Sequence, residues 1–303
     1  MEVIYLDDYI TIEDEICLAV GYFDGLHLGH YALLNKVIQI SQDNHYKKAM
    51  LTFDHHPSYI LDFFESEYYL ESFDDRVQEL EKLGFDYLFV VPFSKTIARF
   101  SADEFIKEFI QPLNVKHVVC GFDFTFGNQA KGNAETLKKY FNTSIIDEVK
   151  YKDEKVSSSI NRALLKEGHI EDANQLLNKP YMIKGKVVKG RQIGRVLGFP
   201  TANIDFKRYV LPKRGVYASY VYIDGKKYLS MTNIGKNPTI TDLVVPSLEV
   251  HIFDFDEDIY NKTITVEFVH FIRDEVKFTN SNALINQLNK DKNQIQEYFK
   301  REC

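Results

Sequence analysis

The sequence predicts an α/β protein in which a doubly wound parallel sheet is followed by a second, antiparallel domain. Its 303 residues suffice for about two domains of 100–200 residues each. In the first half, continuous apolar strands alternate with helices, a pattern typical of βαβ units. In the second half, long helical patterns stop and strands of period two take over. We place the boundary near residue 180, which gives domains 1–180 and 181–303.

Five apolar strands define the first domain, and each is expected to be covered on both faces, as parallel strands are. They are predicted at residues 17–23, 48–53, 86–92, 115–121 and 143–149. Helices are predicted between them at residues 30–41, 72–84, 101–109 and 133–141. Ser72, Ser101 and Asn133 are expected to cap three of these helices.

The second domain is expected to contain an antiparallel sheet or barrel that is followed by a helix. Residues 216–223 and 226–234 flank Asp224-Gly225, a pair typical of a two-residue type I′ hairpin. Residues 249–253 and 263–271 also alternate with period two. A helical pattern at residues 283–288 lies near the end of the chain.

The composition excludes several classes of protein. The formal charge of −7 makes nucleic acid a poor expectation as a partner. No apolar run approaches the roughly 20 residues that a membrane span needs, and no signal peptide is recognised, so we expect a cytoplasmic protein. The three cysteines are far apart, which fits neither a disulfide framework nor a zinc site; Cys17 and Cys120 are expected to be buried filler.

The first chemical constellation is the decapeptide at residues 21–30, which links the first predicted strand to the first helix. Ligands bind at such carboxyl ends of parallel strands, and a helix N-terminus attracts phosphate. His27 and His30 are three residues apart, so both can face one phosphate-sized volume. The alternative is two exposed histidines in a turn. The glycine spacing fits neither a dinucleotide fingerprint nor a P-loop.

The second constellation is a basic, glycine-rich stretch at residues 185–195, followed by residues 197–203. Gly190 and Gly194 would let backbone N–H groups approach phosphates. Thr201 and Asn203 are two apart and would face one side of an extended segment. A hydroxyl and an amide oxygen suit Mg²⁺ that carries ATP phosphates. The alternative is a strand edge with a Pro-Thr turn.

Together these motifs resemble those of the bacterial bifunctional riboflavin kinase/FAD synthetase family. The decapeptide is similar to the His-x-Gly-His signature of nucleotidyltransferases, and residues 52–57, 121–127 and 156–162 match further motifs in order. Gly198-Phe199-Pro200-Thr201-Ala202-Asn203 and Leu248-Glu249-Val250-His251 resemble riboflavin kinase signatures. The resemblance covers about residues 15–300 and implies a Rossmann-like nucleotidyltransferase domain followed by a β-barrel riboflavin kinase domain with a terminal helix.

The resemblance implies two Mg²⁺-dependent reactions: riboflavin and ATP give FMN, and FMN and ATP give FAD with release of pyrophosphate. Glu249 would be the base of the kinase, with Gly190, Gly194, Thr201 and Asn203 binding ATP and the last two binding Mg²⁺. His27 and His30 would be catalytic in adenylyl transfer. ATP would be bound there by Gly21, Phe23, Asp24, Gly25, His27, His30, Asp123, Ser158 and Arg162. Flavin would be bound by Phe53, His56 and Arg273.

Four departures from the family pattern bear on the first domain. Tyr22 replaces a usual Asn, His55 a usual Pro and His169 a common Asp, and residues 128–131 replace a more basic stretch. If one activity is weak, we therefore expect it to be FAD synthesis. The rival hypotheses are a kinase with a degenerate first domain, a flavin-sensing regulator and another His-x-Gly-His transferase. The expected partners are small molecules, with neither nucleic acid nor membrane, and the expected state is a monomer or weak oligomer.

Overall fold

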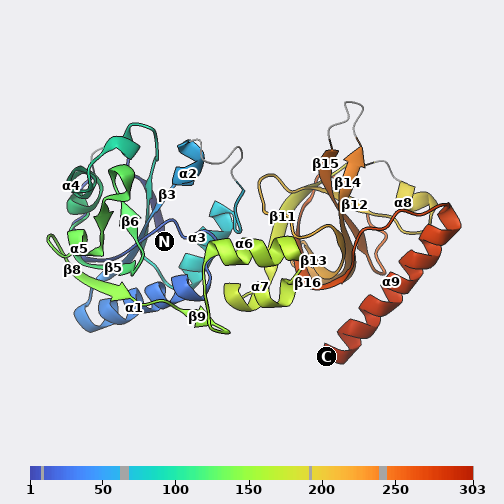
Figure 1. The fold of residues 1–303 in the computed structure, drawn as a ribbon. Coiled ribbons are helices and arrows are strands. Elements are labelled where there is room, and N and C mark those ends of the chain that lie inside the picture. Colours follow the sequence, from blue (N-terminus) through green and yellow to red (C-terminus); the bar gives the residue numbers. More distant parts are fainter. Residues whose placement is uncertain (8–9, 62–67, 191–192, 239–243, 303) are drawn as a thin grey trace. The chain divides into compact units, whose positions relative to one another are not determined.

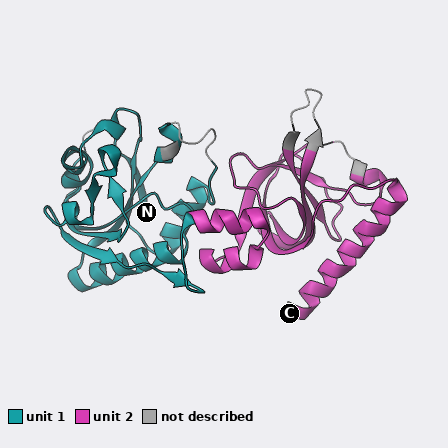
Figure 2. Cartoon of the chain, in the orientation of Figure 1, with its two compact units in different colours: residues 1–158 teal, residues 159–303 magenta. Residues whose placement is uncertain are grey.

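A computed structural model describes residues 1–7, 10–61, 68–190, 193–238 and 244–302 (Figure 1). The chain divides into two compact units, Met1–Ser158 and Ser159–Cys303 (Figure 2). Each unit has its own core and is described separately.

The first unit is built on a six-stranded sheet in the order β1-β4-β3-β2-β5-β8, and every adjacent pair is parallel. The strands are β1 (Glu2–Tyr5), β2 (Ile16–Val20), β3 (Lys47–Phe53), β4 (Tyr87–Val91), β5 (Val115–Gly121) and β8 (Asn142–Ile146). The predicted parallel sheet is confirmed, and β1 is an additional edge strand. The chain runs outward from β2 through β3 to β4, and later returns to the other side of β2 with β5. This reversal makes the carboxyl ends of β2 and β5 the expected ligand position.

The helices of the first unit begin where the predicted caps place them. Ser72 accepts from the Asp75 backbone N–H before α3 (Phe73–Lys82), and Ser101 forms a complete capping box before α4 (Ala102–Phe105). The other α-helices are α1 (Leu28–Asn44), α2 (Pro57–Ile60) and α5 (Ala134–Leu137). Helix α5 is shorter than predicted, and a π-helical turn at Ile106–Ile110 follows α4. Two short hairpins complete the unit: β6 (Thr125–Phe126) with β7 (Gly132–Asn133), and β9 (Lys150–Tyr151) with β10 (Glu154–Lys155).

The sheet is covered on both faces, as its continuous apolar strands predict. Leu18 and Val20 belong to one core cluster, whereas Cys17 and Ala19 belong to the other. Alternate residues of β2 thus serve opposite faces. Cys17 and Cys120 are buried free cysteines, in agreement with their predicted role as filler. Burial raises the pKa of the Cys17 thiol to about 12.

The second unit contains a closed barrel in the order β11-β12-β15-β14-β13-β16, with antiparallel pairing throughout. The strands are β11 (Tyr181–Val188), β12 (Ala202–Asp205), β13 (Gly215–Ile223), β14 (Lys226–Pro238), β15 (Val244–Ile252) and β16 (Thr263–Arg273). The predicted hairpin is confirmed, because Asp224 and Gly225 both have positive φ and Ile223 pairs with Lys226.

Helices α6 (Ser158–Glu167) and α7 (Ile170–Leu177) precede the barrel, and α7 packs against β11 and β16. The Asn174 amide donates to the Phe268 carbonyl of β16 at 3.0 Å and accepts from the Tyr181 N–H of β11 at 2.7 Å. The Lys213 N–H donates to the Leu165 carbonyl at 2.8 Å. Residues 159–180, which the sequence analysis assigned to the first domain, therefore belong to the compact unit of the barrel, and His169 lies there as the N-terminal flanking residue of α7.

Two further helices belong to this unit, α8 (Ile193–Val196) and the terminal helix α9 (Ser281–Glu302). Ile295 and Phe299 of α9 are buried in a cluster with Val216 and Ala218 of β13. The terminal helix therefore covers part of the outer wall of the barrel (Figure 1). None of the helices in the described part of the chain has both the length and the apolar character that a membrane crossing requires.

Candidate active sites

The loop between β2 and α1 brings the two predicted histidines together. His27 is the N-cap of α1, and its Nδ1 accepts from the His30 backbone N–H at 3.3 Å. The two imidazole rings stack with centroids 3.6 Å apart. Gly29 makes this possible, because a Cβ there would lie 3.1 Å from the His27 ring. The first turn of α1 thus holds both rings at the carboxyl end of β2.

Hydrogen bonds fix the tautomers of both rings. Since His27 Nδ1 accepts a hydrogen bond, the neutral ring carries its proton on Nε2. His30 Nδ1 lies 3.3 Å from the Gly25 carbonyl, which can only accept, so that ring carries its proton on Nδ1. Burial lowers the pKa of His27 to about 4, and burial together with the neighbouring His27 holds the pKa of His30 well below its usual value. At neutral pH the pair offers hydrogen bonds without charge.

Asp123 and Lys155 form a charged pair close to these rings. Asp123 follows β5, and its carboxylate is paired with the Lys155 ammonium of β10. The two charges shift the pKa of His27 in opposite directions: Asp123 raises it and Lys155 lowers it. The Lys155 ammonium also lies 4.8 Å from the centroid of the exposed Phe122 ring. The predicted residue Asp123 therefore lies near the histidines, with an ammonium attached.

Asp24 and Ser158 tie the same loop to its neighbours. The buried Asp24 carboxylate accepts from the Leu70 N–H at 2.9 Å, and the Asp24 carbonyl accepts from the Ser158 hydroxyl at 2.8 Å. Through these contacts Asp24 holds the loop against Leu70 and Ser158. Arg162, the other ATP residue predicted on this helix, belongs to the second unit.

The predicted flavin residues Phe53 and His56 lie at the carboxyl end of β3, the strand next to β2. Phe53 packs edge-on against Phe93 with ring centroids 5.1 Å apart. His56 packs edge-on against Tyr22, with centroids 4.5 Å apart. Strands β2, β3 and β5 thus place most of the predicted adenylyltransferase residues along one edge of the sheet.

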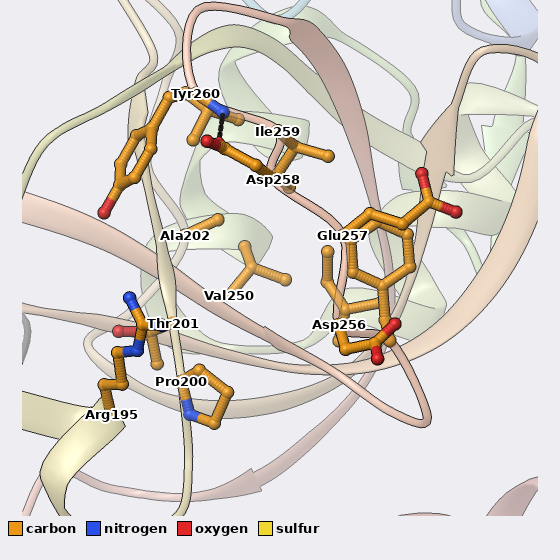
Figure 3. Close-up of a pocket in the computed structure, with 13 residues that line it drawn as sticks. Arg195, Pro200, Thr201, Ala202, Val250, Asp256, Glu257, Asp258, Ile259 and Tyr260 are labelled. Atoms are coloured by element: carbon orange, nitrogen blue, oxygen red, sulfur yellow. Dashed lines mark hydrogen bonds between the residues drawn. The ribbon is translucent and has the colours of Figure 1, made fainter.

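A cavity of about 460 Å³ lies in the second unit, between β11, β12, β15 and the loop after β15 (Figure 3). Arg195 and Tyr260 lie on one side of it and Asp256 and Glu257 on the other. Its lining consists of Val187, Arg195, Pro200, Thr201, Ala202, Val250, Ile252, Phe255, Asp256, Glu257, Asp258, Ile259 and Tyr260. The cavity combines apolar walls with polar groups, as sites for small molecules do.

Thr201 connects this cavity to Glu249. Thr201 lines the cavity, and its hydroxyl donates to Glu249 Oε2 at 3.4 Å. Glu249 lies directly opposite Asn203 on β12 and opposite Asn233 on β14. These three polar side chains share one face of the sheet. Val250, on the other face of β15, lines the cavity. The predicted base and the cavity therefore lie on opposite faces of the same strand.

His251 and Gly190 support this arrangement. The buried His251 ring donates from Nδ1 to the Pro200 carbonyl at 2.8 Å, which holds the segment before β12 against β15. Burial lowers the pKa of His251, so the ring is neutral. Gly190 approaches Asn203 so closely that a Cβ there would lie 2.1 Å from the side-chain nitrogen. Gly194 lies in α8, and a Cβ on it would lie 3.4 Å from the Thr201 hydroxyl; residues 191–192 of the glycine-rich stretch lie outside the described residues.

Arg273 is engaged within the protein. Its Nε and Nη2 donate to the Asp291 carboxylate of α9 at 3.0 and 2.7 Å, and its Nη1 donates to the Asp274 carbonyl at 2.9 Å. The structure thus gives this predicted flavin residue a structural contact with the terminal helix.

Comparisons with known proteins find relatives of both parts of the chain. The family model described as FAD synthetase matches residues 10–160, and the model described as riboflavin kinase matches residues 177–299. A Listeria monocytogenes protein named bifunctional riboflavin kinase/FMN adenylyltransferase is 38% identical over 309 aligned residues, which cover 99% of this chain and 98% of the relative. The chain belongs to this bifunctional riboflavin kinase/FMN adenylyltransferase family.

Two further comparisons extend the family resemblance over both units. The Bacillus subtilis bifunctional riboflavin kinase/FMN adenylyltransferase is 38% identical, over 93% of this chain and 92% of the relative. A crystal structure from Streptococcus pneumoniae, described as a macrolide-efflux protein, has a TM-score of 0.89 and 33% identity, and covers 97% of this chain and 98% of its own. One solved structure therefore contains counterparts of both units of this bifunctional family member.

Several residues of these sites escaped the sequence analysis. Arg76 of α3 is 3% exposed, and its guanidinium donates to the Tyr22 carbonyl and the Thr52 hydroxyl. The Glu71 carboxylate accepts from the Leu26 N–H at 3.3 Å. No motif marks either residue, because each contact joins segments that lie far apart in the sequence. Asp256, Glu257 and Asp258 also line the cavity, and a short acidic run in the sequence does not by itself indicate the wall of a cavity.

Proposed function

We propose that the chain phosphorylates riboflavin in its barrel domain and adenylylates FMN in its sheet domain, with domain limits near 1–180 and 181–303 as expected from the sequence. The observation that carries the proposal is the coexistence of two separate polar sites, at His27 and His30 and at Thr201 and Glu249, in a member of the bifunctional family. ATP is the common co-substrate, and FMN and FAD are the products.

For the kinase, the cavity is the proposed ATP site. Thr201 lies where the cavity meets Glu249, so the γ-phosphate is placed at Thr201 and the riboflavin tail on the face of Glu249. Glu249 takes the proton of the ribityl 5′-hydroxyl, the oxygen attacks the γ-phosphorus, and ADP leaves. Asn203 and Asn233 lie opposite Glu249 on the two neighbouring strands, and the Thr201 hydroxyl donates to its carboxylate.

Magnesium fits the oxygen donors of this site. The Thr201 hydroxyl and the Asn203 amide oxygen would hold Mg²⁺ together with phosphate oxygens, and the ion would neutralise charge on the transferring phosphoryl group. Both are hard ligands, and Gly190 can pack against the Asn203 side chain only because it lacks a Cβ.

For adenylyl transfer, the first turn of α1 is the proposed phosphate site. The helix N-terminus and the His27 Nε2–H are the proposed donors to the ATP triphosphate. The FMN phosphate oxygen attacks the α-phosphorus, and pyrophosphate leaves without a covalent enzyme intermediate. Phe53 and His56 on the adjacent strand are the proposed flavin contacts.

One experiment with two variants tests both halves. Purified protein receives riboflavin, ATP and Mg²⁺, and chromatography separates riboflavin, FMN and FAD. Glu249→Gln should reduce FMN formation about a hundredfold or more because a general base is lost, while supplied FMN is still converted to FAD. The double variant His27→Ala, His30→Ala should make FMN and no FAD. If the wild-type protein converts neither supplied riboflavin to FMN nor supplied FMN to FAD, the proposed function is wrong.

A further inference from the structure

Arg76 carries a buried charge that forms no ion pair with any residue in the described part of the chain. Its side chain lies in the first unit, 3% exposed, on the face of α3 that meets the ends of β2 and β3. Its hydrogen bonds go to two neutral acceptors, the Tyr22 carbonyl at 3.1 Å and the Thr52 hydroxyl at 3.3 Å. Its Nε has no hydrogen-bond partner among the described residues.

Burying a cation without a carboxylate is costly, because the protein interior replaces water poorly. The two buried carboxylates of this region accept hydrogen bonds from backbone N–H groups, Asp24 from that of Leu70 and Glu71 from that of Leu26, and neither lies within ion-pair distance of the Arg76 guanidinium. Among the described ion pairs of this unit, none includes Arg76. A charge retained under these conditions needs a compensating anion, and this unit is proposed to bind one.

The location of Arg76 fits that anion. Its guanidinium lies 5.6 Å from the centroid of the Tyr22 ring, within the loop that carries the stacked histidines, and its charge acts on His30. The histidines are neutral, so they bring no charge to a triphosphate. The ammonium of Lys155 is shared with Asp123. The charge of Arg76 therefore remains available to the bound phosphates.

We infer that Arg76 is a positioning residue of the adenylyltransferase reaction, which holds the Tyr22 carbonyl and stabilises the pyrophosphate part of ATP through its charge, without touching it. The inference rests on the proposed function of the first unit. An unbalanced charge within about 10 Å of an anion, at an effective dielectric constant near 20, changes binding of that anion about tenfold or more.

The test separates the charge of Arg76 from its hydrogen bonds. Arg76→Gln keeps a donor for the Tyr22 carbonyl and loses the charge, whereas Arg76→Lys keeps the charge and loses the planar fork. The readouts are the inhibition constant of inorganic pyrophosphate against ATP in FMN adenylylation, at excess Mg²⁺, and the KM for FMN. Pyrophosphate is a product of this reaction alone, so the second ATP site does not interfere. Riboflavin phosphorylation by the same preparation serves as an internal reference.

With Arg76→Gln, we expect the inhibition constant of pyrophosphate to rise about tenfold or more, with the KM for FMN within about twofold of wild type. With Arg76→Lys it should stay within about threefold. Lys82→Met is the matched control, because it removes one positive charge from the same helix at an exposed position and should change neither constant.

Two results would overturn the inference. Equal inhibition constants for the Gln and Lys variants would show that hydrogen bonding matters and charge does not. A parallel rise in the pyrophosphate constant and the FMN KM, or failure of both variants to fold, would assign Arg76 to stability alone. If the wild-type protein forms no FAD from FMN and ATP, the proposed function of the first unit is instead refuted.

Discussion

At the scale of single residues, the environment of His27 makes the stability of the first unit depend on pH. Burial lowers its folded-state pKa from 6.5 to about 4, so the unfolded chain binds a proton first as the pH falls. The stabilisation is complete above pH 6.5 and is lost between there and about pH 4. The difference corresponds to about 3 kcal/mol of unfolding free energy.

Urea unfolding at pH 7.5 and pH 5 measures this loss, and His27→Asn is the matched control. Asn is also a good N-cap and can accept from the His30 N–H, but it does not titrate. The variant should lose less stability than wild type on acidification. An identical pH dependence of the two proteins would contradict the assigned burial effect.

The same residues show what sequence reasoning can and cannot find. The pair His27 and His30 could be predicted because helical spacing fixes their relative placement within one turn. Arg76 could not, because its contact with Tyr22 spans 54 positions and depends on the packing of α3. These hydrogen bonds go to the backbone carbonyl of Tyr22, so they do not depend on which side chain stands at this position.

At the scale of elements, the ion pair between Arg273 and Asp291 fastens α9 to β16. The Asp291 side chain is 1% exposed, and it also accepts from the Gln287 amide at 2.8 Å. Asp291→Asn would leave a largely buried guanidinium without its counter-charge, so the variant should lose about 2–4 kcal/mol of unfolding free energy. Chemical denaturation of the full chain measures the loss.

The exposed pair Lys213 and Asp274 provides the control for this prediction. Its atoms are 2.7 Å apart, yet its side chains are 38% and 65% exposed. Asp274→Asn should cost at most about 0.5 kcal/mol, because surface ion pairs contribute little. Similar losses in the two variants would contradict a special role for the buried pair.

The periodicity of apolar residues predicted the helices and strands that carry a regular apolar stripe. It missed or shortened those in which few residues are apolar. Strand β1 was missed because it is a four-residue edge strand, half exposed, and so lacks the apolar run of its neighbours. Helix α9 extends well beyond the predicted residues 283–288, because its later turns carry many polar side chains and bury only a narrow stripe that includes Ile295 and Phe299.

At the scale of the whole molecule, the position of α7 defines where the barrel unit begins. Ile170, Ala173, Leu176 and Leu177 of α7 are buried, and Asn174 hydrogen-bonds to β11 and β16. A fragment of residues 159–303 should therefore retain riboflavin kinase activity. A fragment of residues 181–303, cut at the predicted boundary, should unfold at lower temperature because it exposes the apolar surface that α7 covers.

Thermal unfolding and kinase assays of the two fragments test this expectation. Equal melting temperatures and equal activities would show that α6 and α7 are dispensable for the barrel. The boundary proposed from the sequence follows the change from helices to strands near residue 180, whereas the compact units divide after Ser158, because packing decides which unit a helix joins.

The alternation along β15 has a consequence for how this protein can change. Glu249 and Val250 serve different compartments only because neighbouring residues point to opposite sides. A single inserted or deleted residue within Val244–Ile252 would exchange the two sets, and place an aliphatic side chain where the proposed base stands. The face of Glu249 and the cavity wall at Val250 therefore both depend on the length of this nine-residue strand. Within the strand, point substitutions can alter either site, whereas a change of length would disrupt both.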